Sequence, residues 1–149
     1  MKKLGMLVVG AICVSFLSGC GNSGKKLTCT YNLSDDGSRR LEYVLNFDSK
    51  GGKIKSYTQS AVVVYDDETT DEEFNTEYEE AAEVCDNYKD MKGVSCNTSK
   101  NKKEIKVDLK VTMSELDDSS KEALATTEIE ELSYDDFKTY MESASYTCE

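Results

Sequence analysis

Alternation of apolar and polar residues dominates the first half of the chain after its N-terminal segment. Apolar side chains occupy every second position over residues 27–31 and again over residues 41–47, and turn-forming residues separate the two runs. A period of two is typical of half-buried β-strands, so these runs predict an antiparallel hairpin. After a glycine turn, residues 54–65 are rich in β-branched residues and tyrosine, which predicts a third strand. Residues 61–64 are all apolar, so we expect part of this strand to be central.

The period changes between residues 70 and 89, where apolar residues recur every three or four positions. This spacing places them on one side of a helix, and acidic residues occupy the other side. Thr70 and Glu73 have the spacing of a capping box, which marks the start of the helix. We expect a long amphipathic helix that packs on one face of the sheet through five residues: Phe74, Tyr78, Ala81, Cys85 and Tyr88.

Shorter patterns complete the predicted fold. Residues 94–97 predict a short strand, and the uninterrupted alternation over residues 105–113 predicts a longer one. A short helix is expected over residues 119–125, and Ser133 with Asp136 can cap a C-terminal helix. The fold class is therefore α+β: an antiparallel sheet of about five strands with one long amphipathic helix packed on one face and a short C-terminal helix.

The first twenty residues follow a different pattern. Lys2 and Lys3 precede an apolar run over residues 4–17 that contains no charge, as in a secretory signal peptide. The run is shorter than the roughly 20 residues that a transmembrane helix needs. Leu17-Ser18-Gly19-Cys20 resembles a bacterial lipobox, the site where diacylglycerol is attached to the cysteine and the chain is cut before it.

This N-terminal pattern predicts three segments. Residues 1–19 are the lipoprotein signal peptide, residues 20–26 a lipid-anchored flexible tether, and residues 27–149 a single domain. The lipid bilayer is then a partner through diacylglyceryl on Cys20, and the protein is expected at the extracytoplasmic face of the cell membrane. The alternative is an ordinary cleaved signal in which Cys20 is incidental.

Charge limits the classes of partner. The chain has 18 Lys plus Arg against 29 Asp plus Glu, a net charge of −11. Loss of Lys2 and Lys3 with the signal would bring the charge to −13. Such a charge repels nucleic acid from most of the surface, so no nucleic-acid partner is expected. An electrostatic partner would be cationic, although an acidic surface also serves simply to keep an anchored domain soluble.

Four cysteines remain beyond the anchor: Cys29, Cys85, Cys96 and Cys148. An even number in an exported domain predicts two disulfides. Three pairings are possible. We favour Cys85 with Cys96, which ties the long helix to the next strand, and Cys29 with Cys148, which ties the first strand to the C-terminus. A redox pair or metal site is the alternative, but the chain has no Cys-x-x-Cys motif and no histidine.

The absence of histidine also removes the usual general base of hydrolases and the commonest metal ligand. Carboxylate chemistry would need two acidic residues, but with 29 of them no particular pair is indicated. The acidic residues between positions 66 and 73 do not have the spacing of an EF-hand and fit a solvated helix start. The sequence therefore predicts no catalytic residue, no cofactor and no metal site.

The order of features resembles the YehR-like family of small bacterial lipoproteins of unknown function. The resemblance spans nearly the whole mature chain and includes the lipobox and the tyrosine-rich hairpins. It also includes the acidic helix that ends near Asn87-Tyr88, the Lys92-Gly93-Val94 turn, the strand over residues 105–113 and the final Tyr134-Asp135-Asp136-Phe137 helix. It implies an antiparallel sheet with helices and a lipid anchor, with no established enzymatic activity and no catalytic residue to carry over.

These observations together predict a non-enzymatic, membrane-anchored lipoprotein that binds an envelope protein or a cationic or small ligand. The expected binding patch comprises Tyr43, Tyr57 and Tyr65, on the sheet face that the helix leaves uncovered. One alternative is a ligand-carrying lipoprotein similar to a solute-binding subunit. Another is a carboxylate-based cell-wall hydrolase, which would require two buried acidic residues in one cleft.

Overall fold

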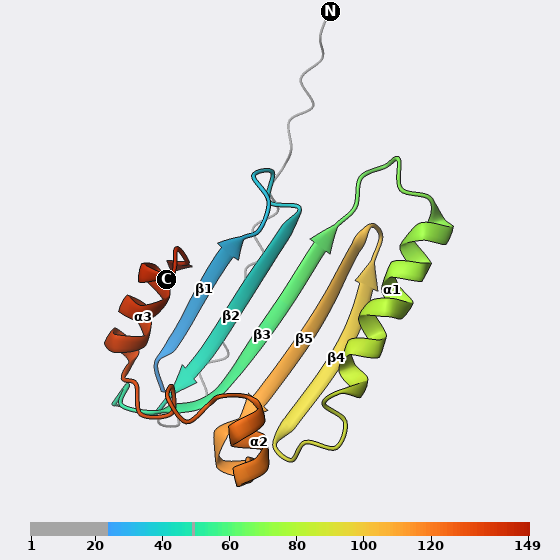
Figure 1. Ribbon diagram of the computed structural model, residues 1–149. Coiled ribbons are helices and arrows are strands. Elements are labelled where there is room, and N and C mark those ends of the chain that lie inside the picture. Colours follow the sequence, from blue (N-terminus) through green and yellow to red (C-terminus); the bar gives the residue numbers. More distant parts are fainter. Residues whose placement is uncertain (1–23, 49) are drawn as a thin grey trace, which may run out of the picture.

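The computed structural model describes residues 24–48 and 50–149. These residues form an α+β fold of one six-stranded sheet and three α-helices, and every neighbouring pair of strands is antiparallel (Figure 1). The strand order is β4-β5-β3-β2-β1-β6. The strands are β1 (Lys26–Asn32), β2 (Arg39–Phe47), β3 (Ile54–Val64), β4 (Val94–Asn101), β5 (Glu104–Thr112) and β6 (Thr147–Cys148). The helices are α1 (Asp71–Asp86), α2 (Asp118–Ala123) and α3 (Tyr134–Ser143), and a 3-10 turn, η1 (Met113–Glu115), precedes α2.

The alternation in the sequence separates an apolar face of the sheet from a polar one. On the apolar face Leu45 lies opposite Tyr57, and Tyr57 lies opposite Val111. All three side chains are buried, with at most 6 % of each exposed. The predicted hairpin and the central position of the third strand are both confirmed, since β3 has two strands on one side and three on the other.

One row of paired residues crosses the apolar face and passes through the site described below. Cys29 on β1 lies opposite Tyr43 on β2, which lies opposite Gln59 on β3. Gln59 in turn lies opposite Leu109 on β5, and Leu109 lies opposite Cys96 on β4. This row, which we call the cysteine row, therefore has a cysteine at each end and a glutamine at its centre.

The polar face carries paired charges and hydroxyl groups. The Nζ of Lys106 lies 3.1 Å from the Oδ1 of Asp108, and the Ser60 hydroxyl donates a hydrogen bond to the same oxygen at 2.5 Å. Next to them, the Nε of Arg40 lies 2.6 Å from the Oε1 of Glu42. Such pairs contribute little each to stability, but they leave this face with little exposed apolar surface that a helix could cover.

Helix α1 differs from the expected long amphipathic helix that covers a face. It begins at the predicted capping box, with the Glu73 N–H donating to the Thr70 hydroxyl. Phe74 is nevertheless its only buried residue, and Val84 is 45 % exposed. The helix lies along the β4 margin of the sheet rather than across its middle (Figure 1).

The physical reason is the short and polar surface that β4 offers to the helix. Thr98 faces α1 and donates its hydroxyl to the Ala81 carbonyl at 3.3 Å. The Nζ of Lys100 lies 4.4 Å from the ring centroid of Tyr78. Because these polar contacts stand where apolar side chains would otherwise pack between β4 and α1, most of the predicted apolar side of the helix is only half-buried.

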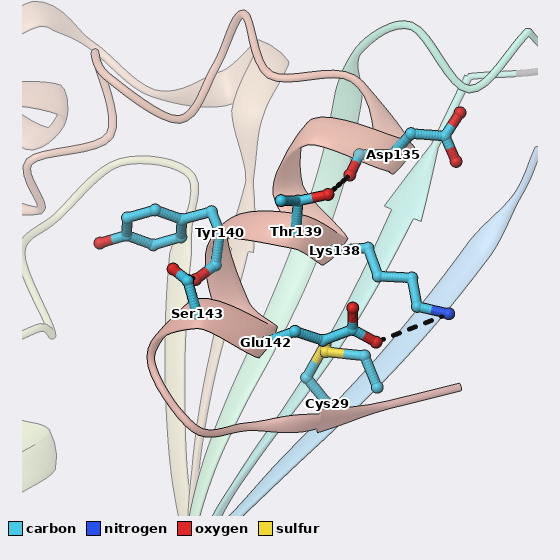
Figure 2. The surroundings of a disulfide bond; sticks show 8 residues. Cys29, Asp135, Lys138, Thr139, Tyr140, Glu142 and Ser143 are labelled. Carbon is cyan, nitrogen blue, oxygen red and sulfur yellow. Dashed lines mark hydrogen bonds and ion pairs between the residues drawn. A yellow bond between two sulfur atoms is a disulfide. The ribbon is translucent and has the colours of Figure 1, made fainter.

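The C-terminal residues supply the second correction, a sixth strand where about five were expected. The two residues of β6 pair with β1, and the backbone groups of Thr28 and Glu149 exchange hydrogen bonds at 2.9 and 2.8 Å. The Cys29–Cys148 disulfide joins the same two strands. Figure 2 shows α3 beside this disulfide, with Tyr140 extending from the helix on the side away from Cys29.

The chain joins the fold slightly before the predicted domain boundary. Strand β1 begins at Lys26. The Lys25 carbonyl accepts a hydrogen bond from the Phe47 N–H at 2.8 Å, and its Nζ lies 5.1 Å from the ring centroid of Tyr134. Lys25 and Lys26 therefore take part in the sheet and its packing.

Candidate binding cavity

A cavity of about 390 Å³ lies on the apolar face, between the sheet and the C-terminal part of the chain. Its floor comes from β2 and β3, one side comes from α3, and the segment after α2 encloses it further. This volume is within the range of small-molecule sites. The lining residues are Tyr43, Leu45, Tyr57, Gln59, Leu124, Ala125, Ile129, Phe137, Tyr140, Met141, Ala144 and Tyr146.

The lining is uncharged, although 32 % of the chain is Asp, Glu, Lys or Arg. Aliphatic and aromatic side chains predominate, and the polar groups are four tyrosine hydroxyls and the amide of Gln59. Such a lining favours an uncharged ligand, because a charged ligand would lose its hydration without gaining an opposite charge.

Local structure explains how these side chains converge. Tyr43 and Leu45 are two positions apart on β2, as are Tyr57 and Gln59 on β3, so all four point to the same face. On α3, Phe137 and Met141 are four positions apart and both are buried against the sheet. The cavity thus has a floor of two strands and a helical wall, both held by the hydrophobic core.

Three tyrosines, of which Tyr43 and Tyr146 line the cavity, pack together beside it. The ring centroid of Tyr146 lies 5.1 Å from that of Tyr31 and 5.7 Å from that of Tyr43. Burial, together with the neighbouring Tyr146, raises the pKa of Tyr43 to about 12, and burial also raises the pKa of Tyr57. Both hydroxyls are therefore protonated at neutral pH, so they can donate hydrogen bonds and the cavity stays uncharged.

The structure brings together two of the three tyrosines of the predicted patch. Tyr43 and Tyr57 line the cavity. Tyr65 does not: its ring packs edge-on against Phe74 with the centroids 5.5 Å apart, and its hydroxyl lies 3.4 Å from the Oε2 of Glu77. The two cavity tyrosines lie on the apolar face of the sheet, which α1 and α3 flank, and not on the polar face.

Sequence reasoning missed the other lining residues. Only Gln59 carries a sequence signal of a site residue, since it is polar at a position of the apolar face, between Tyr57 and Ala61. Tyr146 and Tyr140 come from the C-terminal region, where no strand pattern pointed to the cavity. Leu124 and Ile129 follow α2 in a stretch of successive turns without a regular period.

The disulfides agree with the pairing that the sequence favoured. Cys29 is bonded to Cys148, and Cys85 is bonded to Cys96. The predicted lipidation site Cys20 and the signal peptide lie outside the described residues. Within the part of the chain that the structure covers, no helix is long and apolar enough to cross a membrane.

Where the pKa of a described Asp or Glu departs from its usual value, it is lowered, which favours the ionised carboxylate. Hydrogen bonds from the Ser38 backbone and from serine hydroxyls lower the pKa of Asp36 to about 2, and hydrogen bonds from Thr69 lower that of Asp66. No carboxylate lines the cavity, so this site does not supply the acidic pair that a hydrolase would need. Among residues 24–48 and 50–149, no group of three potential ligands could hold a metal ion.

Comparisons with known proteins bear on the fold. No protein-family model matches the chain, and no curated protein matches it. The fold is similar to the solution NMR structure of the YehR protein of E. coli, with a TM-score of 0.60 at 12 % sequence identity. The similarity covers 86 % of this chain and 92 % of that one. At this identity it shows a YehR-like fold and nothing of location or activity.

Proposed function

We propose that this protein is a lipid-anchored, extracytoplasmic binding protein without enzymatic activity, and that its cavity takes an uncharged, largely apolar small ligand. The observation that carries the proposal is the uncharged lining of the cavity in so acidic a chain. Of the partners expected from the sequence, a small ligand fits this site best. A cationic ligand fits it poorly, because no carboxylate lines the cavity.

The anchor is tested in the native host by the Cys20→Ala variant. We expect the wild-type protein in the membrane fraction, with an intact mass that starts at Cys20 and includes acyl chains. The variant should lack these chains. Cys13→Ala is the matched control, since Cys13 lies within the predicted signal and its replacement should leave the mature mass unchanged. An unlipidated wild-type protein would refute the anchor.

The cavity is tested by methyl NMR of the mature protein, labelled at its methionine methyl groups and held in lipid nanodiscs. Met141 lines the cavity, whereas Met91 and Met113 lie outside the lining. Fluorobenzene should therefore shift the Met141 signal and leave the other two in place. Fluorobenzene is a suitable probe because it is uncharged and apolar and is small relative to a 390 Å³ cavity.

A substitution at the rim locates the binding. Ala144 lines the cavity and is exposed, so Ala144→Trp should obstruct it and weaken fluorobenzene binding about tenfold, equivalent to about 1.4 kcal/mol. Ala123→Trp places the same side chain on α2 outside the lining and should leave the affinity unchanged. Equal affinities in the two variants, or no Met141 shift at all, would contradict the proposed site.

A further inference from the structure

We infer that the ligand of this cavity carries an amide or an equivalent paired donor and acceptor, which the side-chain amide of Gln59 recognises. The inference rests on the proposed function, because it names the chemistry that the same cavity selects. The candidate class is an uncharged primary carboxamide, in which one N–H and the carbonyl lie on the same side of the group.

Gln59 occupies an unusual place for its residue type. It is the only glutamine in the chain, and it lies at the centre of the cysteine row on the apolar face. Its neighbours across the strands are Tyr43 and Leu109, and its half-buried side chain lines the cavity floor. A leucine or valine at this position would fit the surrounding core without bringing a polar group into it.

The amide of Gln59 has no partner in the part of the protein that the structure describes. None of the hydrogen bonds between described side chains involves it, and none of those residues has a fully buried side-chain nitrogen or oxygen without a partner. The amide therefore remains accessible from the cavity, with both its N–H groups and its carbonyl free.

Tyr57, which lines the cavity next to Gln59, carries a hydroxyl that is also without a partner among the described residues. Its side chain is 6 % exposed, and its hydroxyl forms no hydrogen bond with another described residue. By the same reasoning this hydroxyl is not fully enclosed, and the raised pKa of Tyr57 keeps it protonated. Tyr57 and Gln59 are two positions apart on β3, so both side chains belong to the cavity floor.

Energetics then determine the ligand class. A purely apolar ligand that covered Gln59 would displace water from its amide and leave a donor and an acceptor unpaired. A primary carboxamide returns both hydrogen bonds, since its carbonyl accepts from the Gln59 N–H and its N–H donates to the Gln59 carbonyl. The apolar lining around these groups excludes water and makes the discrimination larger than it would be on an open surface.

Two nearly isosteric probes test this selection, benzamide and acetophenone. Acetophenone keeps the ring and the carbonyl of benzamide but replaces its NH₂ group by a methyl group, so it leaves the Gln59 carbonyl unpaired. In the wild-type protein we expect benzamide to shift the Met141 methyl signal with about tenfold higher affinity than acetophenone, as one net hydrogen bond allows. In the Gln59→Leu variant this preference should disappear.

The controls separate failure of this inference from failure of the proposed function. Thr58→Val changes the neighbouring residue, which points to the polar face, and should keep the preference for benzamide. If Gln59→Leu does not fold, Gln59→Met serves as a second variant of similar length. The role of Gln59 is overturned if the folded Gln59 variant still prefers benzamide, or if the wild type binds the two probes equally. Either result leaves the proposed function of the cavity standing. If fluorobenzene, benzamide and acetophenone all leave Met141 unshifted, the proposed function itself fails.

Discussion

Replacing Cys29 and Cys148 together by alanine is expected to lower the free energy of unfolding by about 5 kcal/mol. The bond closes a loop with a sequence separation of 119, so its loss gives the unfolded chain a large amount of conformational entropy. Loss on this scale approaches the whole stability of a small domain, so the variant should be largely unfolded at 37 °C. Guanidinium titration followed by circular dichroism measures the change.

The second disulfide gives a matched comparison. Cys85 and Cys96 are separated by only 11 residues, for which the same loop-entropy argument gives about 3 kcal/mol. The Cys85→Ala, Cys96→Ala double variant should therefore be the more stable of the two. A reversed order would show that native packing around the bonds, rather than loop length, determines their contributions.

Phe47→Ala is expected to reduce the free energy of unfolding by about 3 to 5 kcal/mol. Phe47 is 1 % exposed, and its ring meets Tyr134 edge-on with the centroids 5.4 Å apart. Truncation would leave a void between the end of β2 and the start of α3, where the surrounding backbone is held by the sheet. Thermal and urea unfolding of the purified variant would measure the loss.

A surface variant supplies the control for Phe47. Leu33 is 56 % exposed in the turn between β1 and β2, so Leu33→Ala should change the stability by no more than about 0.5 kcal/mol. Similar losses for the two substitutions would mean that Phe47 does not anchor the core as its burial indicates.

The strands were predictable because each carries its own signal. Strand β5 pairs over nine residues with β3, and its period-two pattern is evident without reference to any partner. Strand β6 has only two residues, Thr147 and Cys148, which is too short for a period. Its existence depends on pairing with β1 at the other end of the chain, and only the cysteines pointed to that contact.

Helix α1 shows a second limit of prediction from the sequence, which concerns where a helix packs. The three-and-four spacing over residues 71–86 predicts a helix and its apolar side, and the capping box predicts its start. The pattern does not say which part of the sheet will receive that side. Here the receiving strand is β4, whose residues facing the helix include Thr98 and Lys100, so the helix lies at the margin with one buried residue.

The candidate site was predictable only in part, because a sequence pattern gives side-chain direction within one element but not how elements pack together. Tyr43 and Tyr57 share a face because alternation fixes side-chain direction within a strand. Tyr65 has the same parity as Tyr57, but eight residues of extended chain place it about 26 Å farther along. The remaining wall, including Ile129, comes from a segment of turns, and only tertiary packing brings that segment to the cavity.

The cysteine row gives the molecule a property that its separate bonds do not suggest. One bond fastens the C-terminal end, which carries Tyr146, at Cys29, and the other fastens α1 at Cys96, so both attachments lie on the same cross-section of the sheet as Gln59. The distance between the two flanks is thus fixed by covalent geometry and by the spacing of the strands between them. Tyr43 and Gln59, which belong to the cavity floor, lie between these two attachments, so the floor is covalently tied to both flanks of the sheet.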